Sequence, residues 1–348
     1  MRQAPIAAKQ SRKIVLTASI LFFAVSAAAA AQSLSVSVYP PESEAAWGNS
    51  LFPAAYLNSH LEAMAAREAA RPYWVASESE LAARLSGANE TLSLLLNNDV
   101  LAFYGHPRSK NMGILGRYSK EELNRRLDAL AEEYKAAGGG RGVLKAFYII
   151  YGTVWPEGEI GILSETVLKE YIEYAQANDI LVFIDHQIGR HDPVDSLKRM
   201  LPWLKYPNVH LALDPEWRTT MPMKEIGMVT AEEINQAQKV MEDYMIENHI
   251  PGERMLVIHQ FNWRMISGRE KVQSSFRRVR LVHCADGFGS PEVKKQSYEY
   301  NARASNMPIK GFKLFYNSGI SGAGYDSPLL SPRDVVELNP RPYIIMYQ

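Results

Sequence analysis

Two acidic residues close a run of apolar residues in the stretch NVHLALDPEWRT, where Asp214 and Glu216 flank a proline. Residues two apart in a β-strand point to the same side, so the two carboxylates are predicted to share one face, opposite the leucines that precede them. Their Cα atoms are expected to lie roughly 6–7 Å apart. Such a pair can form a salt-bridged strand end, bind a metal or perform acid/base chemistry.

Acid/base chemistry follows if the pair lies in a partly dry site. Two neighbouring carboxyl groups cannot both ionise freely there, so the pKa of one of them rises. The result is a proton donor beside an anion, which is the pairing that glycoside hydrolysis uses. We expect Glu216, the outer residue, to be the general acid. Asp214 would orient it, hold the proton or stabilise positive charge, and Trp217 would stack against a sugar ring.

Strand-like and helix-like segments alternate from residue 98 onward, which favours a parallel sheet covered by helices. Eight segments have the pattern of strands: DVLAFYGHP, GVLKAFYIIYGT, DILVFIDHQIG, NVHLALDPEW, RMLVIHQF, VRLVHCADG, KGFKLFYNS and RPYIIMYQ. Helices are expected in SKEELNRRLDALAEEYKAAGGG, SETVLKEYIEYAQAND, PVDSLKRMLPWL and TAEEINQAQKVMEDYMIENH, and the intervals after the fifth and seventh strands are only weakly helical. Eight strands over about 250 residues predict an α/β fold of the (β/α)₈ TIM-barrel type, with an open doubly wound sheet as the alternative.

Chemistry in such a barrel collects at the carboxyl ends of the strands, and these ends are unusually polar here. The strand starts are mostly apolar or carry ordinary surface residues. If the polar residues were only ordinary surface residues, they would occur equally at both ends of the strands. The polar ends therefore predict a ligand site. The expected catalytic group is Glu216, Asp214, Asp185, Asp286 and His259. The side chains expected to contact the substrate are Tyr104, His106, Gln187, Trp217, Gln260, Lys313, Tyr316 and Tyr347.

Several of these residues also have a plain structural explanation. A structural role explains His259 as well as a functional one does, and Asp286 can organise the Gly-rich turn in HCADGFG. Lys313 can neutralise nearby carboxylates. Cys284 is best explained as a small core residue, because nothing in the sequence supports an activated thiolate.

The D-x-E arrangement of Asp214 and Glu216 resembles that of barrel-fold chitinases and of one class of barrel-fold lysozymes. The resemblance implies Glu216 as the acid and Asp214 as its assistant, with the substrate's own acetamido group involved in some members. The chitinase pattern has a further Asp two residues earlier, where this chain has Ala212. Many barrel glycosidases use a second Glu at the end of the seventh strand, and KLFYNSG has none. Asp185 or Asp286 would then supply the second carboxylate.

A closer similarity extends over residues 101–348. The motifs FYGHP…MGILG, LALDPEW, HQF, HCADGFG and KLFY occur in this order and resemble an uncharacterised family of secreted bacterial proteins. The resemblance implies a barrel of glycoside-hydrolase type and gives no substrate.

The N-terminal residues are typical of an export signal. A basic stretch, an apolar stretch and a run of small residues predict a signal peptide over residues 1–31. A linker is expected over 32–50 and a helical segment over 51–97, before the barrel at 98–348. The apolar stretch is short for a membrane span, and an uncleaved signal anchor is the alternative. We expect a secreted or periplasmic protein.

Composition excludes some function classes. The chain of 348 residues has 38 Lys and Arg against 38 Asp and Glu, so a partner bound mainly through charge, such as nucleic acid or an anionic membrane surface, is not expected. The single cysteine excludes an intrachain disulfide. We expect a carbohydrate or polysaccharide substrate, no cofactor and no metal.

Two other functions stay open beside the main prediction, an exported glycoside hydrolase that uses carboxylate general acid catalysis. The first is a metal-dependent hydrolase, for example a phosphodiesterase, although no H-x-H or H-x-x-x-H pair indicates a metal geometry. Its ligands would come from His106, Asp185, Glu216, His259 and Asp286. The second is a carbohydrate-binding barrel without catalytic activity.

Overall fold

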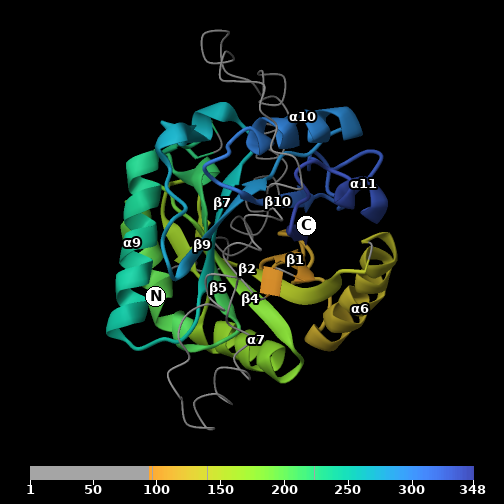
Figure 1. Ribbon diagram of the computed structural model, residues 1–348, viewed down its shortest axis with the longest axis horizontal. Coiled ribbons are helices and arrows are strands. Elements are labelled where there is room, and N and C mark those ends of the chain that lie inside the picture. The colour runs from red at the N-terminus through yellow and green to blue at the C-terminus, as the bar shows by residue number, and fades with distance from the viewer. Residues whose placement is uncertain (1–93, 96, 139, 223) are drawn as a thin grey trace, which may run out of the picture.

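A closed barrel of eight parallel strands forms the centre of the molecule. The computed structural model describes residues 94–95, 97–138, 140–222 and 224–348. The strands follow the order β1-β11-β10-β9-β7-β5-β4-β2, and pairing of β1 with β2 closes the barrel (Figure 1). They are β1 (Asn98–Gly105), β2 (Gly142–Val154), β4 (Ile180–Gln187), β5 (Val209–Asp214), β7 (Arg254–Gln260), β9 (Val279–Ala285), β10 (Ile309–Leu314) and β11 (Ile344–Tyr347). The predicted (β/α)₈ barrel is confirmed, and closure excludes an open sheet.

Helices cover the outside of the barrel. They are α6 (Lys120–Ala137), α7 (Glu165–Ala177), α8 (Pro193–Met200) with the 3-10 turn η1 (Leu201–Lys205), α9 (Ala231–Glu247), α10 (Pro291–Ala302) and α11 (Pro332–Val336). All four predicted helices are confirmed. In the fully described interval after β7, only η3 (Trp263–Met265), the short strand β8 (Ile266–Ser267) and η4 (Arg269–Lys271) occur, as the weak helical pattern predicted.

Side-chain caps set where several helices begin, and thereby where the preceding loops end. Ser119 caps α6 by accepting a hydrogen bond from the Glu122 amide, and Thr230 and Glu233 form a reciprocal capping box at the start of α9. Asp192 and Ser290 cap α8 and α10, which both begin with proline. These caps hold the loops at the carboxyl face of the barrel, where function is expected.

The strands contribute to two cores because their side chains alternate. Ala102, Tyr148, Phe183, Ala212 and Val257 belong to the core inside the barrel. The neighbouring residues in the same strands pack against the helices in a larger outer core, which includes Leu101, Phe147, Val182, Leu211 and Ile258. The register of each strand therefore decides which polar side chains at its end point inward.

Two short pairings add to the barrel at its carboxyl face. Strand β3 (Ile160–Ile162) pairs antiparallel with the long end of β2. Strand β6 (Val229–Thr230) pairs with β8 and so joins the loop after β5 to the loop after β7. The second pairing connects two loops that begin at predicted site residues.

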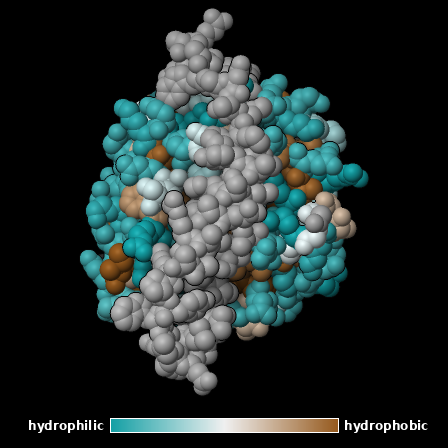
Figure 2. Space-filling model, in the orientation of Figure 1, coloured by the Kyte–Doolittle hydropathy of each residue, from teal (hydrophilic) through white to brown (hydrophobic). Residues whose placement is uncertain are grey.

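The predicted signal peptide (1–31) and linker (32–50), and all but the last residues of the predicted helical segment (51–97), lie outside the described residues. None of the helices in the described ranges is both long enough and apolar enough to cross a bilayer. On the face shown in Figure 2, the described surface is mainly hydrophilic, with hydrophobic residues in small separate groups.

Candidate active site

A cleft with a volume of about 760 Å³ lies at the carboxyl ends of the barrel strands. Its lining combines charged side chains with aromatic rings. The charged residues that lie at or just after strand ends are Asp214, Glu216, Asp286 and Lys313. The aromatic residues include Tyr104, Trp217, Phe261, Phe288, Phe315 and Tyr316.

The Asp214–Glu216 pair is built from a strand end and a turn. Asp214 is the last residue of β5, and Pro215–Trp217 form the 3-10 turn η2. The Asp214 side chain caps this turn, since its Oδ1 accepts a hydrogen bond from the Glu216 amide at 3.2 Å. The prediction that strand alternation places both residues on one face is therefore wrong for Glu216. The turn, which begins with proline, presents Glu216 instead.

Close backbone packing holds this turn in place. The Glu216 carbonyl accepts a hydrogen bond from the Gly227 amide at 2.6 Å, as the loop after β5 folds back over η2. A Cβ atom at position 227 would lie 2.3 Å from the Pro215 carbonyl oxygen and 2.6 Å from that of Glu216. Only glycine fits this approach.

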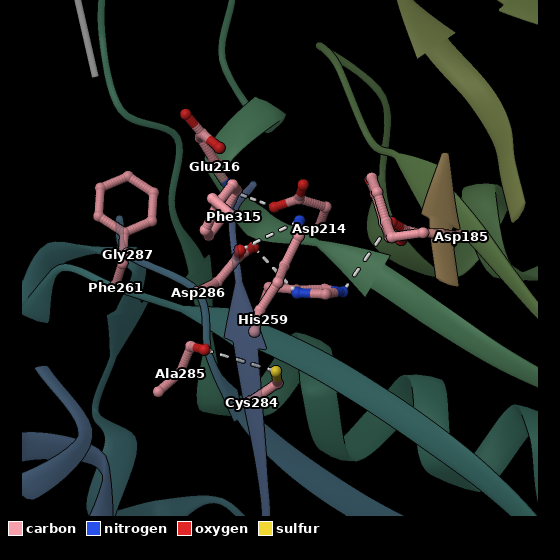
Figure 3. A network of polar contacts seen from close by, with 12 residues as sticks. Asp185, Asp214, Glu216, His259, Phe261, Cys284, Ala285, Asp286, Gly287 and Phe315 are labelled. Atoms are coloured by element: carbon pink, nitrogen blue, oxygen red, sulfur yellow. Dashed lines mark hydrogen bonds and ion pairs between the residues drawn. The ribbon is translucent and has the colours of Figure 1, made fainter. Parts of the chain in front are cut away.

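The Glu216 carboxylate lines the cleft, and no hydrogen bond or ion pair to it occurs within the described ranges. Figure 3 shows it pointing away from the polar network below, while the Asp214 carboxylate lies between the two. Burial raises the pKa of Glu216 well above its ordinary value, and the negative charge of Asp214 adds to the rise. Glu216 therefore presents to the cleft a carboxyl group whose pKa is raised.

Asp214 sits deeper, and only 3% of its surface is exposed. Burial raises its pKa to about 7, against the opposing effect of His259. Asp185 and Asp286 contribute to the rise. The pKa values of both carboxyl groups of the pair are therefore raised, that of Asp214 to about 7.

A buried network of fixed charges lies beneath the pair (Figure 3). Asp286 Oδ2 is 3.0 Å from His259 Nδ1, and Asp286 Oδ1 is 3.1 Å from Lys313 Nζ. Burial acts to raise the pKa of Asp286, but Lys313 and His259 outweigh it and lower the pKa to about 2. Burial opposes charge on His259, yet Asp286 and Asp185 raise its pKa well above its ordinary value. One anion is thus held between two cations.

His259 has contacts on both ring nitrogens. Its Nε2 is 2.7 Å from the Tyr148 hydroxyl, and Asp185 Oδ2 lies 3.9 Å from the same nitrogen. The Tyr104 hydroxyl donates to Asp185 Oδ2 at 2.9 Å. Burial raises the pKa of Asp185, against the positive charges of His259 and Lys313. These contacts fix the orientation of the imidazole ring inside the barrel.

The structure brings most of the predicted residues together. Tyr104, Gln187, Asp214, Glu216, Trp217, Asp286, Lys313 and Tyr316 line the cleft. Asp185 and His259 lie below the lining as fully buried members of the network. Their side chains are therefore not exposed in the cleft and reach it only through the residues above them.

Three predicted substrate contacts do not line the cleft. Gln260 and Tyr347 each follow an inward-facing residue, so strand alternation turns them outward. The amide of Gln260 bonds to His283 Nε2 at 2.7 Å, and the Tyr347 hydroxyl lies 2.8 Å from that of Tyr134 on α6. His106 lies in the turn after β1, where its Nδ1 accepts a hydrogen bond from the amide of Arg108.

The sequence pattern missed other residues of the site. Tyr148 lies in the middle of a hydrophobic strand. Only the alternation that points its side chain into the barrel could have indicated its contact with His259. Arg117, Arg125 and Arg126 also line the cleft, from the loop after β1 and from α6. The prediction considered only residues at strand ends. None of the three arginines lies at a strand end, so the sequence pattern did not indicate them.

Metal ligation finds no support in the geometry. In the described ranges, no group of three or more His, Cys, Asp or Glu side chains is arranged to hold a metal ion. The predicted ligand His259 uses both ring nitrogens within the protein, and Glu216 stands apart from the network. Cys284 is buried, and burial raises the pKa of its thiol, as expected of a core cysteine.

Comparisons with known proteins give remote likenesses only. No protein-family model and no curated protein matches the chain. An oxaloacetate acetylhydrolase structure shares 11% identity over 72% of this chain and 75% of that one, with a TM-score of 0.44. A family 18 chitinase from Crocus vernus shares 9% identity over 72% and 92% of the two chains, with a TM-score of 0.42. A chitinase from Ipomoea carnea shares 11% identity over 71% and 93%, also with a TM-score of 0.42.

Likeness at this level assigns neither a reaction nor a substrate to this chain. The similarity of its motifs to a family of secreted bacterial barrel proteins stays a prediction, because no family model matches.

Proposed function

We propose that this protein is an exported glycoside hydrolase in which Glu216 is the general acid and Asp214 its partner. The observation that carries the proposal is the Glu216 carboxyl group: it faces the cleft, has a raised pKa and lies beside a second carboxyl group that titrates near neutral pH. An acid catalyst must hold a proton at the working pH and must reach the leaving group. The raised pKa of Glu216 and its position in the cleft lining support this role.

The reaction would proceed by proton donation and charge stabilisation. Glu216 gives its proton to the glycosidic oxygen as the bond from that oxygen to the anomeric carbon breaks. Positive charge develops on the sugar ring, and an ionised Asp214 stabilises it. Water then supplies its hydroxyl to the anomeric carbon, and its remaining proton returns to the carboxyl pair. The aromatic side chains Trp217 and Tyr316 offer flat surfaces for sugar rings.

The buried network would keep Asp214 in a constant electrostatic environment. Asp286, His259 and Lys313 all influence the pKa of Asp214, and all three are buried. Fixed charges that do not reorganise during the reaction are an efficient way to stabilise a changing charge. Their role is positioning, with the chemistry left to Glu216 and Asp214.

Export is part of the proposal because the N-terminal residues have the pattern of a signal peptide. Mass spectrometry of the protein recovered from the periplasm or the culture medium tests it. A mature N-terminus near residue 32 is the expected result, and an intact N-terminus in the cytoplasmic fraction would contradict it.

The enzymatic part is tested by measuring released reducing sugar over a panel of neutral and acidic polysaccharides. Glu216→Gln keeps the size of the side chain but removes the proton donor, so activity is expected to fall by about 10²- to 10⁴-fold. Glu173→Gln is the matched control, since Glu173 is exposed on α7 and pairs with Lys169. Activity lost to a chelator and restored by a divalent metal would favour the metal-dependent alternative.

A further inference from the structure

The cleft has a second charged region, formed by Arg117, Arg125 and Arg126. These residues come from the loop after β1 and from α6. In the barrel, β1 is separated from β5 by β2 and β4 on one side and by four strands on the other. The three arginines therefore lie across the barrel mouth from Glu216, which follows β5.

Arg117 is held in a fixed position by backbone carbonyl groups. Its Nε donates to the Lys110 carbonyl at 2.9 Å, and its Nη2 donates to the Ser318 carbonyl at 3.4 Å. No carboxylate pairs with Arg117 within the described ranges, so its charge is not neutralised locally. A guanidinium carries five N–H groups, and these two bonds leave others for a ligand.

Arg125 and Arg126 share one carboxylate. Both guanidinium groups bond to Glu122, at 2.7 Å from Arg125 Nη2 and 2.7 Å from Arg126 Nε. Arg126 also lies 4.0 Å above the Tyr118 ring. Glu122 is outside the cleft lining, and Glu133 is the acidic residue that α6 adds to it. Even with Glu122 and Glu133 both counted, the three guanidinium groups outnumber the nearby carboxylates, and the region carries net positive charge.

We infer that Arg117, Arg125 and Arg126 form a subsite for the carboxylate or sulfate group of an acidic saccharide. We call this group the arginine subsite. Arginine binds such oxyanions through paired, charge-assisted hydrogen bonds, and a guanidinium that is already held in place loses little entropy on binding. With Glu216 as the acid and the arginine subsite in the same cleft, the substrate class that we infer is an anionic polysaccharide. That the protein cleaves such a saccharide rests on the proposed function. That it binds one through the arginine subsite does not.

Binding by the Glu216→Gln variant tests the inference without turnover. Isothermal titration calorimetry would use oligogalacturonate and its carboxyl-reduced counterpart, and sulfated dextran oligosaccharides with unsulfated dextran. At least one anionic probe is expected to bind 10-fold or more tightly than its neutral counterpart, and its affinity should fall as salt is added. The two probe pairs distinguish a carboxylate ligand from a sulfate ligand.

Adding Arg117→Met to this variant is expected to weaken binding of the anionic probe by about 10- to 100-fold, through loss of charge-assisted hydrogen bonds. The matched control is Arg333→Met, which removes an exposed arginine of α11 that is outside the cleft lining. It should leave binding unchanged. Equal affinity for charged and neutral probes, no binding of either anionic probe, or no effect of Arg117→Met would each overturn the inference.

The two proposals can fail separately. If the wild-type protein binds an anionic probe through Arg117 but cleaves no glycan, the arginine subsite stands and the glycosidase is rejected. If it cleaves a neutral glycan in a manner that depends on Glu216 and shows no preference for anions, the arginine subsite is rejected and the glycosidase stands.

Discussion

His259 Nδ1 lies 3.0 Å from Asp286 Oδ2, although one residue belongs to β7 and the other follows β9. Because β7 and β9 are neighbouring parallel strands, their carboxyl ends place the two side chains together. The other oxygen of Asp286 contacts Lys313 at the end of β10. Three adjacent strands thus contribute one buried anion and two cations, directly beneath the carboxyl pair that we propose performs the chemistry.

Removing the anion should cost stability as well as activity. Asp286→Asn leaves His259 and Lys313 as buried charges without their counterion, and loss of one partner from a buried ion pair typically costs about 3–5 kcal/mol. Urea denaturation measures the change in the free energy of unfolding. Asp243→Asn is the control, since it breaks only an exposed pair with Lys239 on α9 and should cost less than about 1 kcal/mol. A loss as small as the control's would contradict the buried network.

The pKa of Asp214 predicts a pH-dependent stability. It is about 7 in the folded protein, and about 4 in an unfolded chain. The folded state therefore binds more protons than the unfolded state between these values, so this group lowers the free energy of unfolding as pH rises from about 4 to about 7. Asp286, with a folded pKa of about 2, has the opposite sign and adds stability as pH rises from about 2 to about 4.

Asp214→Asn isolates the first effect. The variant should lose less stability than the wild type between about pH 4 and pH 7, because Asn does not titrate. Chemical denaturation at intervals across this range gives the slope for each protein. Identical slopes would show that Asp214 titrates at an ordinary value in the folded state.

The periodicity of the sequence was sufficient to predict the barrel. All eight strands and four of the helices were predicted at the segments where they occur, since apolar runs alternate with amphipathic ones. The site was predicted in part. Asp214, Asp286 and Lys313 were found because they are polar residues at or just after the carboxyl ends of strands. Gln260 and Tyr347 were predicted to contact the substrate because they are polar residues at strand ends. The alternation of side chains along each strand turns both of them outward instead.

Other features depend on contacts between distant segments. No local pattern indicates that the loop after β5 folds back so that Gly227 packs on η2, or that Tyr148 reaches His259 across the barrel. The same holds for Lys294 of α10, which donates to the carbonyl groups of Gly287 and Lys313. Such contacts appear only once the fold is assembled.

Lys294 provides a further prediction. Its fully buried ammonium group also lies 3.3 Å from Asp326, and the Asp326 carboxylate accepts hydrogen bonds from the Gly289 and Phe315 amides. This pair joins the loops that follow Asp286 and Lys313. Lys294→Met should destabilise the protein by about 3–5 kcal/mol, because Asp326 is left as an unpaired buried charge.

Lys294→Met, Asp326→Asn and the double variant form a cycle that separates the pair from its surroundings. The double variant should cost less than the sum of the single changes if the two residues act together. Strict additivity, measured by urea denaturation, would show that they act independently.

The proton-donor role of Glu216 is tested most directly by varying the leaving group. Once the sugar is known, kcat/KM for wild type and Glu216→Gln would be compared on its natural glycoside and on its 2,4-dinitrophenyl glycoside, whose leaving group needs no protonation. A general acid predicts a loss of about 10²- to 10⁴-fold on the natural glycoside and a far smaller loss on the dinitrophenyl one. Equal losses on both substrates, or none on either, would contradict the assignment of Glu216 as the acid.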